Sequence, residues 1–135
     1  MNLTPLLEAP LAVKLHVATV LPAFVLGAYL ILASKKGAPL HRALGYLYLS
    51  LMGATSLAAM FVHGIAPDWP LGLSPIHLFV PLTLYYAIAG WRAARAHNVR
   101  AHKNAMLGLY TGALLIAGAF TFLPGRIMFR IFFGP

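Results

Sequence analysis

The sequence predicts an all-α integral membrane protein, built as a bundle of four transmembrane helices from two parallel helical-hairpin repeats. The first observation is composition: 61% of the 135 residues are hydrophobic and 9% are charged, too few for the polar surface of a soluble fold. The second is a set of four apolar runs, each near the roughly 20 residues that cross a bilayer. The third is a histidine pattern that occurs twice along the chain.

The four apolar runs are separated by short segments that favour turns. The predicted helices cover about 12–34, 43–63, 75–92 and 104–124. Basic residues, glycine and proline fill the breaks, as expected where a chain turns outside the hydrocarbon. We therefore predict one membrane domain over residues 1–135, with repeat 1 at about 11–63, repeat 2 at about 72–124 and an interfacial tail at 125–135.

Positive charge is concentrated in two of the predicted loops. The chain has ten Lys and Arg residues against two acidic residues, Glu8 and Asp68. The two hairpin loops carry Lys35, Lys36, Arg42, Arg92, Arg95, Arg100 and Lys103. Because short cytoplasmic loops are enriched in Lys and Arg, we expect both loops inside and both termini outside a bacterial cytoplasmic membrane. The lipid bilayer is the expected partner and nucleic acid is not, since topology accounts for the net charge of +8.

Residue types that the chain lacks exclude several kinds of chemistry. With no cysteine, it cannot form a disulfide, a cysteine-ligated iron–sulfur cluster or a thiol nucleophile. No Asp or Glu falls within a predicted helix, which removes a carboxylate proton relay and paired-carboxylate hydrolysis. A metal ion or haem iron in the membrane would therefore be held by histidine.

Two units of the same design follow one another in the sequence. His41 follows His16 by 25 residues, and His102 follows His77 by the same 25 residues. Each unit contains a helix, a basic loop, a His-basic pair and a second helix. Since each unit crosses the membrane twice, both enter from the same side, which makes the repeats parallel and places equivalent residues at the same depth.

Histidines at matching depths predict haem ligation. A polar side chain within a membrane helix is costly, so it usually faces the bundle interior and has a partner there. His16 and His77 form the first expected pair, with two imidazoles approaching one haem iron from opposite sides, as cofactors are held in other four-helix bundles. His41 and His102 form the expected second pair.

Basic residues beside the second histidine pair suit the propionate groups of haem. They are Arg42, Arg100 and Lys103. We predict a small b-type haem membrane cytochrome that transfers electrons and holds one or two haem b groups by bis-histidine ligation. If it is an enzyme, it would be a haem-dependent membrane oxidoreductase that exchanges electrons with a quinone or a redox protein.

Other interpretations of the same residues stay open. Each histidine can instead donate a hydrogen bond to a nearby carbonyl group and serve only the structure. His63, on the same side as His16 and His77, would complete a three-histidine zinc or copper site for binding or transporting a divalent metal. A third interpretation is an assembly factor for a respiratory complex. The spacing of Gly108 and Gly112 is typical of close helix packing and would suit a homodimer.

Three segments carry a resemblance to a known family. They are KGAPLHRALGYLY at 36–48, SPIH at 74–77 and NVRAHKNAM at 98–106. In these segments the chain resembles the bacterial predicted membrane protein family called domain of unknown function 2306, which implies a four-helix membrane protein and brings no established activity. More distantly, the helix-paired histidines look like dihaem b-type cytochromes, and the last segment looks like small membrane proteins associated with haem-copper oxidase maturation. Those two likenesses are analogies at the level of the fold.

Overall fold

The computed structural model describes residues 1–63, 70 and 74–134, and every regular element among them is helical. This confirms the predicted all-α class. The elements are α1 (Thr4–Leu7), α2 (Leu11–Leu32), α3 (Pro39–Met60), η2 (Pro75–Leu78), α4 (Phe79–Arg95), α5 (Val99–Leu109), η3 (Tyr110–Ile116), α6 (Ala117–Phe120) and α7 (Ile127–Phe133).

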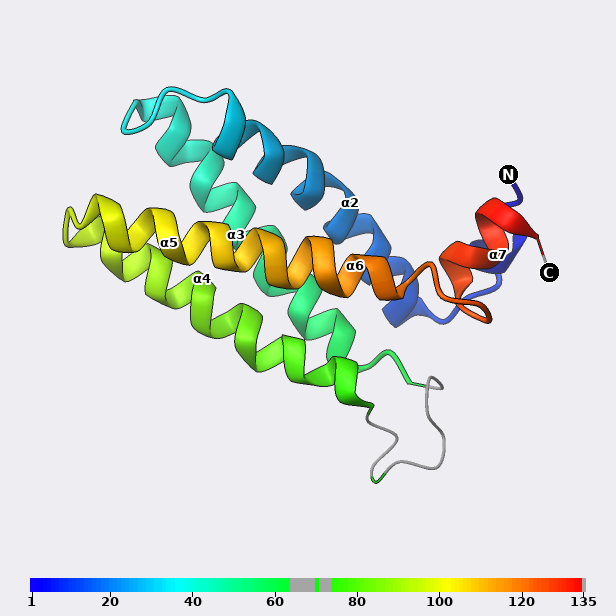
Figure 1. Cartoon of the computed structure of the whole chain (residues 1–135). Helices are drawn as coiled ribbons and strands as arrows, with labels where there is room; N and C mark the ends of the chain where they lie inside the picture. Colours follow the sequence, from blue (N-terminus) through cyan, green and yellow to red (C-terminus); the bar gives the residue numbers. More distant parts are fainter. Residues whose placement is uncertain (64–69, 71–73, 135) are drawn as a thin grey trace.

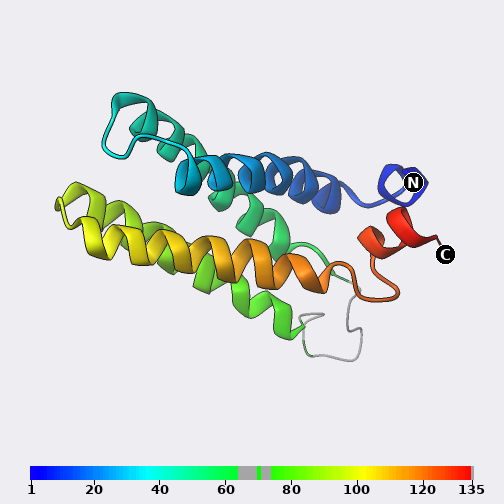
Figure 2. The same cartoon turned by 45° about the horizontal axis from the view of Figure 1, so that its top comes forward.

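Two helical hairpins pack side by side (Figure 1). The first joins α2 to α3, and the second joins α4 to the continuous helical segment formed by α5, η3 and α6. The hairpins meet where α3 packs against α4 and where η3 contacts α2. Both hairpin loops lie at one end of the molecule, here called the loop end, and both termini lie at the other, the terminal end (Figures 1 and 2).

Helices α3 and α5 begin earlier than the apolar runs predict. Pro39 occupies the first position of α3, where its missing N–H is not needed. Asn98 caps α5, because its side-chain oxygen accepts a hydrogen bond of 3.1 Å from the Ala101 N–H. These start signals act on the backbone regardless of polarity. His41 and His102 consequently lie in the first turns of α3 and α5.

The second hairpin departs from a regular α-helix at two places. A 3₁₀ turn over Pro75–Leu78 precedes α4, which has 17 residues, and η3 is a π-helix within the last long segment. Among the described residues, α2 and α3 are the two helices long and apolar enough to cross a membrane, with mean hydropathies of 2.1 and 1.3. Many large apolar side chains point outward on all long segments, as on a lipid-facing surface.

The terminal end is closed by two short helices. α1 packs against α7, and the backbone N–H of Asn2 donates a hydrogen bond of 2.9 Å to the Ile131 carbonyl. The side chain of Ile131 is buried in this contact. The segment predicted as an interfacial tail therefore contains a helix that packs on the N-terminus.

A close contact around Gly27 joins the two hairpins. A Cβ atom at Gly27 would lie 2.7 Å from the Tyr110 ring and 2.8 Å from the Tyr48 ring. Tyr110 also donates a hydrogen bond of 3.1 Å from its hydroxyl to the Phe24 carbonyl in α2. Glycine at this position thus lets a side chain of α3 and one of η3 approach the backbone of α2 together. The surrounding core contains Ala23, Leu30, Tyr48, Met52, Leu109 and Leu114.

We expect Gly27→Ala to lower the free energy of unfolding by about 1–3 kcal/mol, because two rings must move to admit one methyl group. Gly45→Ala is the matched control. A Cβ atom at Gly45 meets nothing within 4 Å, so the higher helix propensity of alanine should leave that variant as stable as the parent or up to about 1 kcal/mol more stable. Unfolding in detergent, followed by circular dichroism, measures both; equal loss in the two variants would contradict the contact.

Candidate functional site

Four of the six histidines are half-buried, and these are the four that recur in the sequence repeat. His16 lies near the start of α2 and His77 in η2, both toward the terminal end, whereas His41 and His102 lie at the loop end. His63 and His97 are exposed. Burial therefore separates the repeated histidines from the other two.

His41 is held by a short chain of hydrogen bonds that runs through Ser34. The Ser34 hydroxyl donates its single hydrogen to the Leu30 carbonyl, at 2.9 Å. The His41 Nδ1 lies 2.6 Å from the same Ser34 oxygen. With the Ser34 hydrogen on the Leu30 carbonyl, Nδ1 of His41 carries the proton and donates it to Ser34. The lone pair of Nε2 is then available to a ligand.

His102 is held in an equivalent way by the other hairpin. Its Nδ1 lies 2.8 Å from the Gly90 carbonyl oxygen of α4. A carbonyl group only accepts hydrogen bonds, so Nδ1 carries the proton and the Nε2 lone pair is again available. His41 and His102 thus lie at the same end of the molecule, in the first turns of α3 and α5.

One open position and three cationic side chains lie near these two histidines along the chain. Gly45 follows His41 by one helical turn, and a Cβ atom there would meet nothing within 4 Å. Met106, which follows His102 by one turn, packs against Gly90 of α4. Three exposed cationic side chains adjoin the two histidines in the sequence: Arg42, Arg100 and Lys103.

At the terminal end, His16 is tied to the neighbouring helix. Its Nδ1 lies 3.0 Å from the Thr55 carbonyl oxygen of α3, which leaves the Nε2 lone pair available. The Thr55 hydroxyl donates to the Thr19 hydroxyl at 2.8 Å, and Thr19 donates in turn to the Leu15 and His16 carbonyls. His16 thus belongs to a small polar cluster between α2 and α3.

His77 uses both of its ring nitrogens. The Ser74 N–H donates to Nδ1 at 3.0 Å, which forms a capping box at the start of η2 with histidine in the place usually taken by Glu or Gln. With Nδ1 accepting, Nε2 carries the proton and donates to the Val62 carbonyl at 3.0 Å. His77 therefore joins the start of α4 to the segment that follows α3, while His16 bonds to a carbonyl about two turns earlier in that hairpin.

His63 lies beside His77, with ring centroids 6.2 Å apart. Its Nδ1 is 2.9 Å from the Phe61 carbonyl, and its side chain is exposed. Across residues 1–63, 70 and 74–134, no three His, Asp or Glu side chains gather into a group that could hold a metal ion. The predicted three-histidine arrangement of His16, His63 and His77 is thus not assembled in the described part of the chain.

Sequence reasoning missed the groups that orient the two loop-end histidines. Ser34 ends the first predicted helix and was given no role, although a serine close to a helix end commonly bonds to a carbonyl one turn earlier. The Gly90 carbonyl gives no signal in the sequence, because every residue has a backbone carbonyl. The usable clue was a histidine just before the apolar run of the second helix in each hairpin.

We expect His77→Leu to lower the free energy of unfolding by about 1–2 kcal/mol, since it removes the helix cap and the bond to Val62. His97→Asn is the control, because His97 is exposed with φ of +56°, a conformation that asparagine tolerates. Chemical unfolding and amide hydrogen exchange at Ser74 measure the two effects. Unchanged exchange at Ser74 in His77→Leu would contradict the capping role.

The comparisons with known proteins agree with the apolar helical architecture. No curated protein and no solved structure matched the chain. A family described as "Predicted membrane protein (DUF2306)" matches residues 13–134. The match covers both hairpins and all four half-buried histidines. The chain belongs to the predicted membrane protein family DUF2306.

Proposed function

We propose that this protein is a small b-type cytochrome of the bacterial cytoplasmic membrane, which binds haem between His41 and His102 and transfers electrons. One observation carries the proposal. The two hairpins bring a histidine each to the loop end, and both present a free Nε2 lone pair while a protein group holds Nδ1. This is how histidine ligands of metals are usually oriented.

The proposed placement in the membrane is four helical crossings. η2 and α4 together run continuously over 75–95, and α5, η3 and α6 run over 99–120. Each therefore has about the number of residues that a bilayer requires. Seven Lys and Arg residues in the two hairpin loops and the adjoining helix ends favour a cytoplasmic loop end, which puts both termini outside.

The same hydrogen bonds support the proposal that the hairpins are parallel repeats. His41 connects through Ser34 to the Leu30 carbonyl of the preceding helix, and His102 bonds to the Gly90 carbonyl of the preceding helix. Matching residues of the two repeats are 61 positions apart, as His41 and His102 are. Leu30 therefore matches residue 91, one position from Gly90. Each second helix thus uses its histidine to bind the last turns of the first.

The residues around the pair fit a haem group. Nε2 of each histidine would ligate the iron, and the Nδ1–H bonds would fix the ring planes and raise ligand basicity. The open space at Gly45 leaves room for a macrocycle edge, and Arg42, Arg100 and Lys103 would pair with the propionates. When bound, haem supplies one-electron redox chemistry, and the protein sets its potential through these ligands and their surroundings. The electron partner would be a quinone or a redox protein.

A second haem between His16 and His77 is the less supported part of the proposal. His16 has a free Nε2 lone pair, but both nitrogens of His77 are engaged with Ser74 and Val62. Ligation of iron by His77 would therefore require the bond to Val62 to break and the helix start to rearrange. The loop-end pair meets no such cost.

The decisive measurement is the absorption spectrum of the full chain purified after expression with a haem precursor. We expect a Soret band that shifts on reduction, and we expect at least a ten-fold lower haem content in His41→Ala and in His102→Ala. His97→Ala, a histidine loss in a neighbouring loop, should retain the pigment. His77→Leu should retain the haem of the loop-end pair.

Added imidazole distinguishes lost ligation from failed folding, because it can replace the missing ring in His41→Ala or His102→Ala and restore the band. A colourless protein, or a band unaffected by both variants, would contradict the proposal. Colourless protein that contains stoichiometric zinc or copper would favour the metal-binding alternative. Colourless, metal-free protein bound tightly to a respiratory complex would favour the assembly alternative.

A further inference from the structure

We propose that the open groove between α3 and α4 binds one anionic phospholipid, with an acyl chain along the groove and the phosphate at Arg92 and Arg95. This site lies apart from the histidine pair, so it does not depend on the proposed cytochrome function. It rests on the shape of the groove, on the aromatic residues at its loop end and on the arginines beside them.

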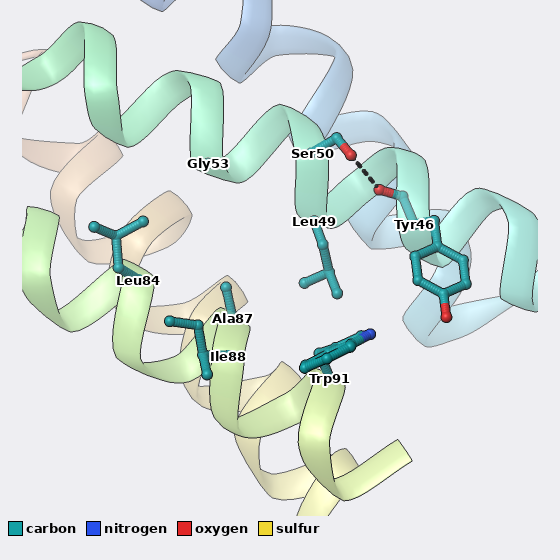
Figure 3. Close-up of a pocket in the computed structure, with 8 residues that line it drawn as sticks. All are labelled: Tyr46, Leu49, Ser50, Gly53, Leu84, Ala87, Ile88 and Trp91. Carbon is teal, nitrogen blue, oxygen red and sulfur yellow. Dashed lines mark hydrogen bonds between the residues drawn. The ribbon is translucent and has the colours of Figure 1, made fainter. Parts of the chain in front are cut away.

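The groove is a shallow, open, mostly apolar hollow between α3 and α4, called the channel below (Figure 3). It has a volume of about 310 Å³ and is lined by Tyr46, Leu49, Ser50, Gly53, Leu84, Ala87, Ile88 and Trp91. Gly53 has no side chain and so leaves space on the α3 side of the groove. A Cβ atom there would meet nothing within 4 Å. From Leu84 to Trp91 the groove extends over two turns of α4, about 10 Å, most of the depth of one leaflet.

Hydrogen-bond donors stand at one end of this channel. Tyr46 and Trp91 lie at the same end in Figure 3, with Gly53 and Leu84 at the other. Their side chains are 55% and 41% exposed, and neither the Tyr46 hydroxyl nor the Trp91 indole N–H bonds to another described residue. Tyr and Trp rings prefer the level of lipid headgroups, where such donors meet phosphate and ester oxygens. The donors therefore mark the headgroup end of the channel.

Two arginines extend the same end of the groove. The Arg95 guanidinium lies over the Trp91 ring, 5.5 Å from its centroid. Arg92 lines an adjoining hollow of about 380 Å³ together with Tyr85, Ile88 and Ala89. Ile88 borders both hollows, so the two lie next to each other along α4. A phosphate near Trp91 would thus lie close to the Arg95 guanidinium, and Arg92 follows Trp91 directly in the sequence.

These arginines lack an acidic partner in the loops around them. The only carboxylate side chains of the chain are Glu8 and Asp68, and neither belongs to the two hairpin loops. Arg92 and Arg95 share that end of the protein with five further Lys and Arg residues. An anionic headgroup supplies the missing counter-charge, and the apolar channel supplies the site for its chain. This combination favours an anionic phospholipid over a zwitterionic one.

Fluorescence of Trp91 tests the site directly. The full chain carrying Trp69→Phe, which leaves Trp91 as the single tryptophan, is reconstituted in phosphatidylcholine vesicles. Two samples are compared, in which the same fraction of the lipid is brominated phosphatidylglycerol or brominated phosphatidylcholine. The bromine atoms on the acyl chain quench a tryptophan in contact with them. We expect an apparent preference for phosphatidylglycerol of about five-fold or more, the effect expected for one arginine at a membrane surface.

Two matched pairs of variants separate the headgroup from the chain. Arg92→Gln with Arg95→Gln should bring the preference close to parity, whereas Arg126→Gln with Arg130→Gln removes the same charge elsewhere and should preserve it. Gly53→Leu should fill the channel and lower quenching by both brominated lipids at least two-fold. Gly118→Leu adds the same side chain at another open position and should not. Circular dichroism checks that each variant is folded.

Several outcomes would overturn the proposal. Equal quenching by the two lipids would show that the groove has no preference for an anionic headgroup. Equal effects of the two arginine pairs would show that the preference follows from the net charge of the protein and not from a site at Arg92 and Arg95. Full competition by inorganic phosphate would make the ligand a free anion. Quenching by an added quinone that phosphatidylglycerol does not displace would assign the groove to a quinone.

Discussion

The absence of water from hydrocarbon governs this structure, because every polar group placed there must find a partner within the protein. Helices provide hydrogen-bond partners for the backbone N–H and carbonyl groups. The half-buried histidines form hydrogen bonds from their ring nitrogens to groups of neighbouring elements. His16 bonds to Thr55, His77 to Val62 and His102 to Gly90. These bonds connect neighbouring helical elements of a membrane protein, whose helices gain no hydrophobic force from lipid to press them together. The same groups that could hold a cofactor therefore also hold the bundle.

Histidine has two ring nitrogens. The two histidine pairs differ in how many of these nitrogens form hydrogen bonds within the protein. At the loop end one nitrogen of His41 and one of His102 is bonded, and the second is left for chemistry. At the terminal end His77 begins a helix, so its Nδ1 accepts from Ser74 and its Nε2 donates to Val62. Residues that match in the sequence can thus differ in chemical availability because the local helix starts differ.

Charge divides the molecule along the same axis. The loop end carries most of the cations, and the acidic residues belong to other segments. Some of these cations serve the protein itself: the Lys36 ammonium group donates to the Ile31 and Ser34 carbonyls at the end of α2. Arg92 and Arg95 are instead exposed, and the proposed phospholipid would supply their counter-charge. Arg42, Arg100 and Lys103 adjoin the histidine pair, where the proposed haem would supply it.

The amino-acid sequence by itself determined the helical class, the membrane family, the basic hairpin loops and the four histidines that become half-buried. It did so because apolar content, loop charge and spacing are properties of the chain that do not depend on how helices pack. It did not determine that Pro39 and Asn98 bring His41 and His102 into helices, that η3 is a π-helix or that Gly27 admits two rings. Nor did it reveal which nitrogen of each histidine is free. Only the tertiary structure decided these points, because the partners are backbone carbonyls and neighbouring helices, and their positions exist only once the chain has folded.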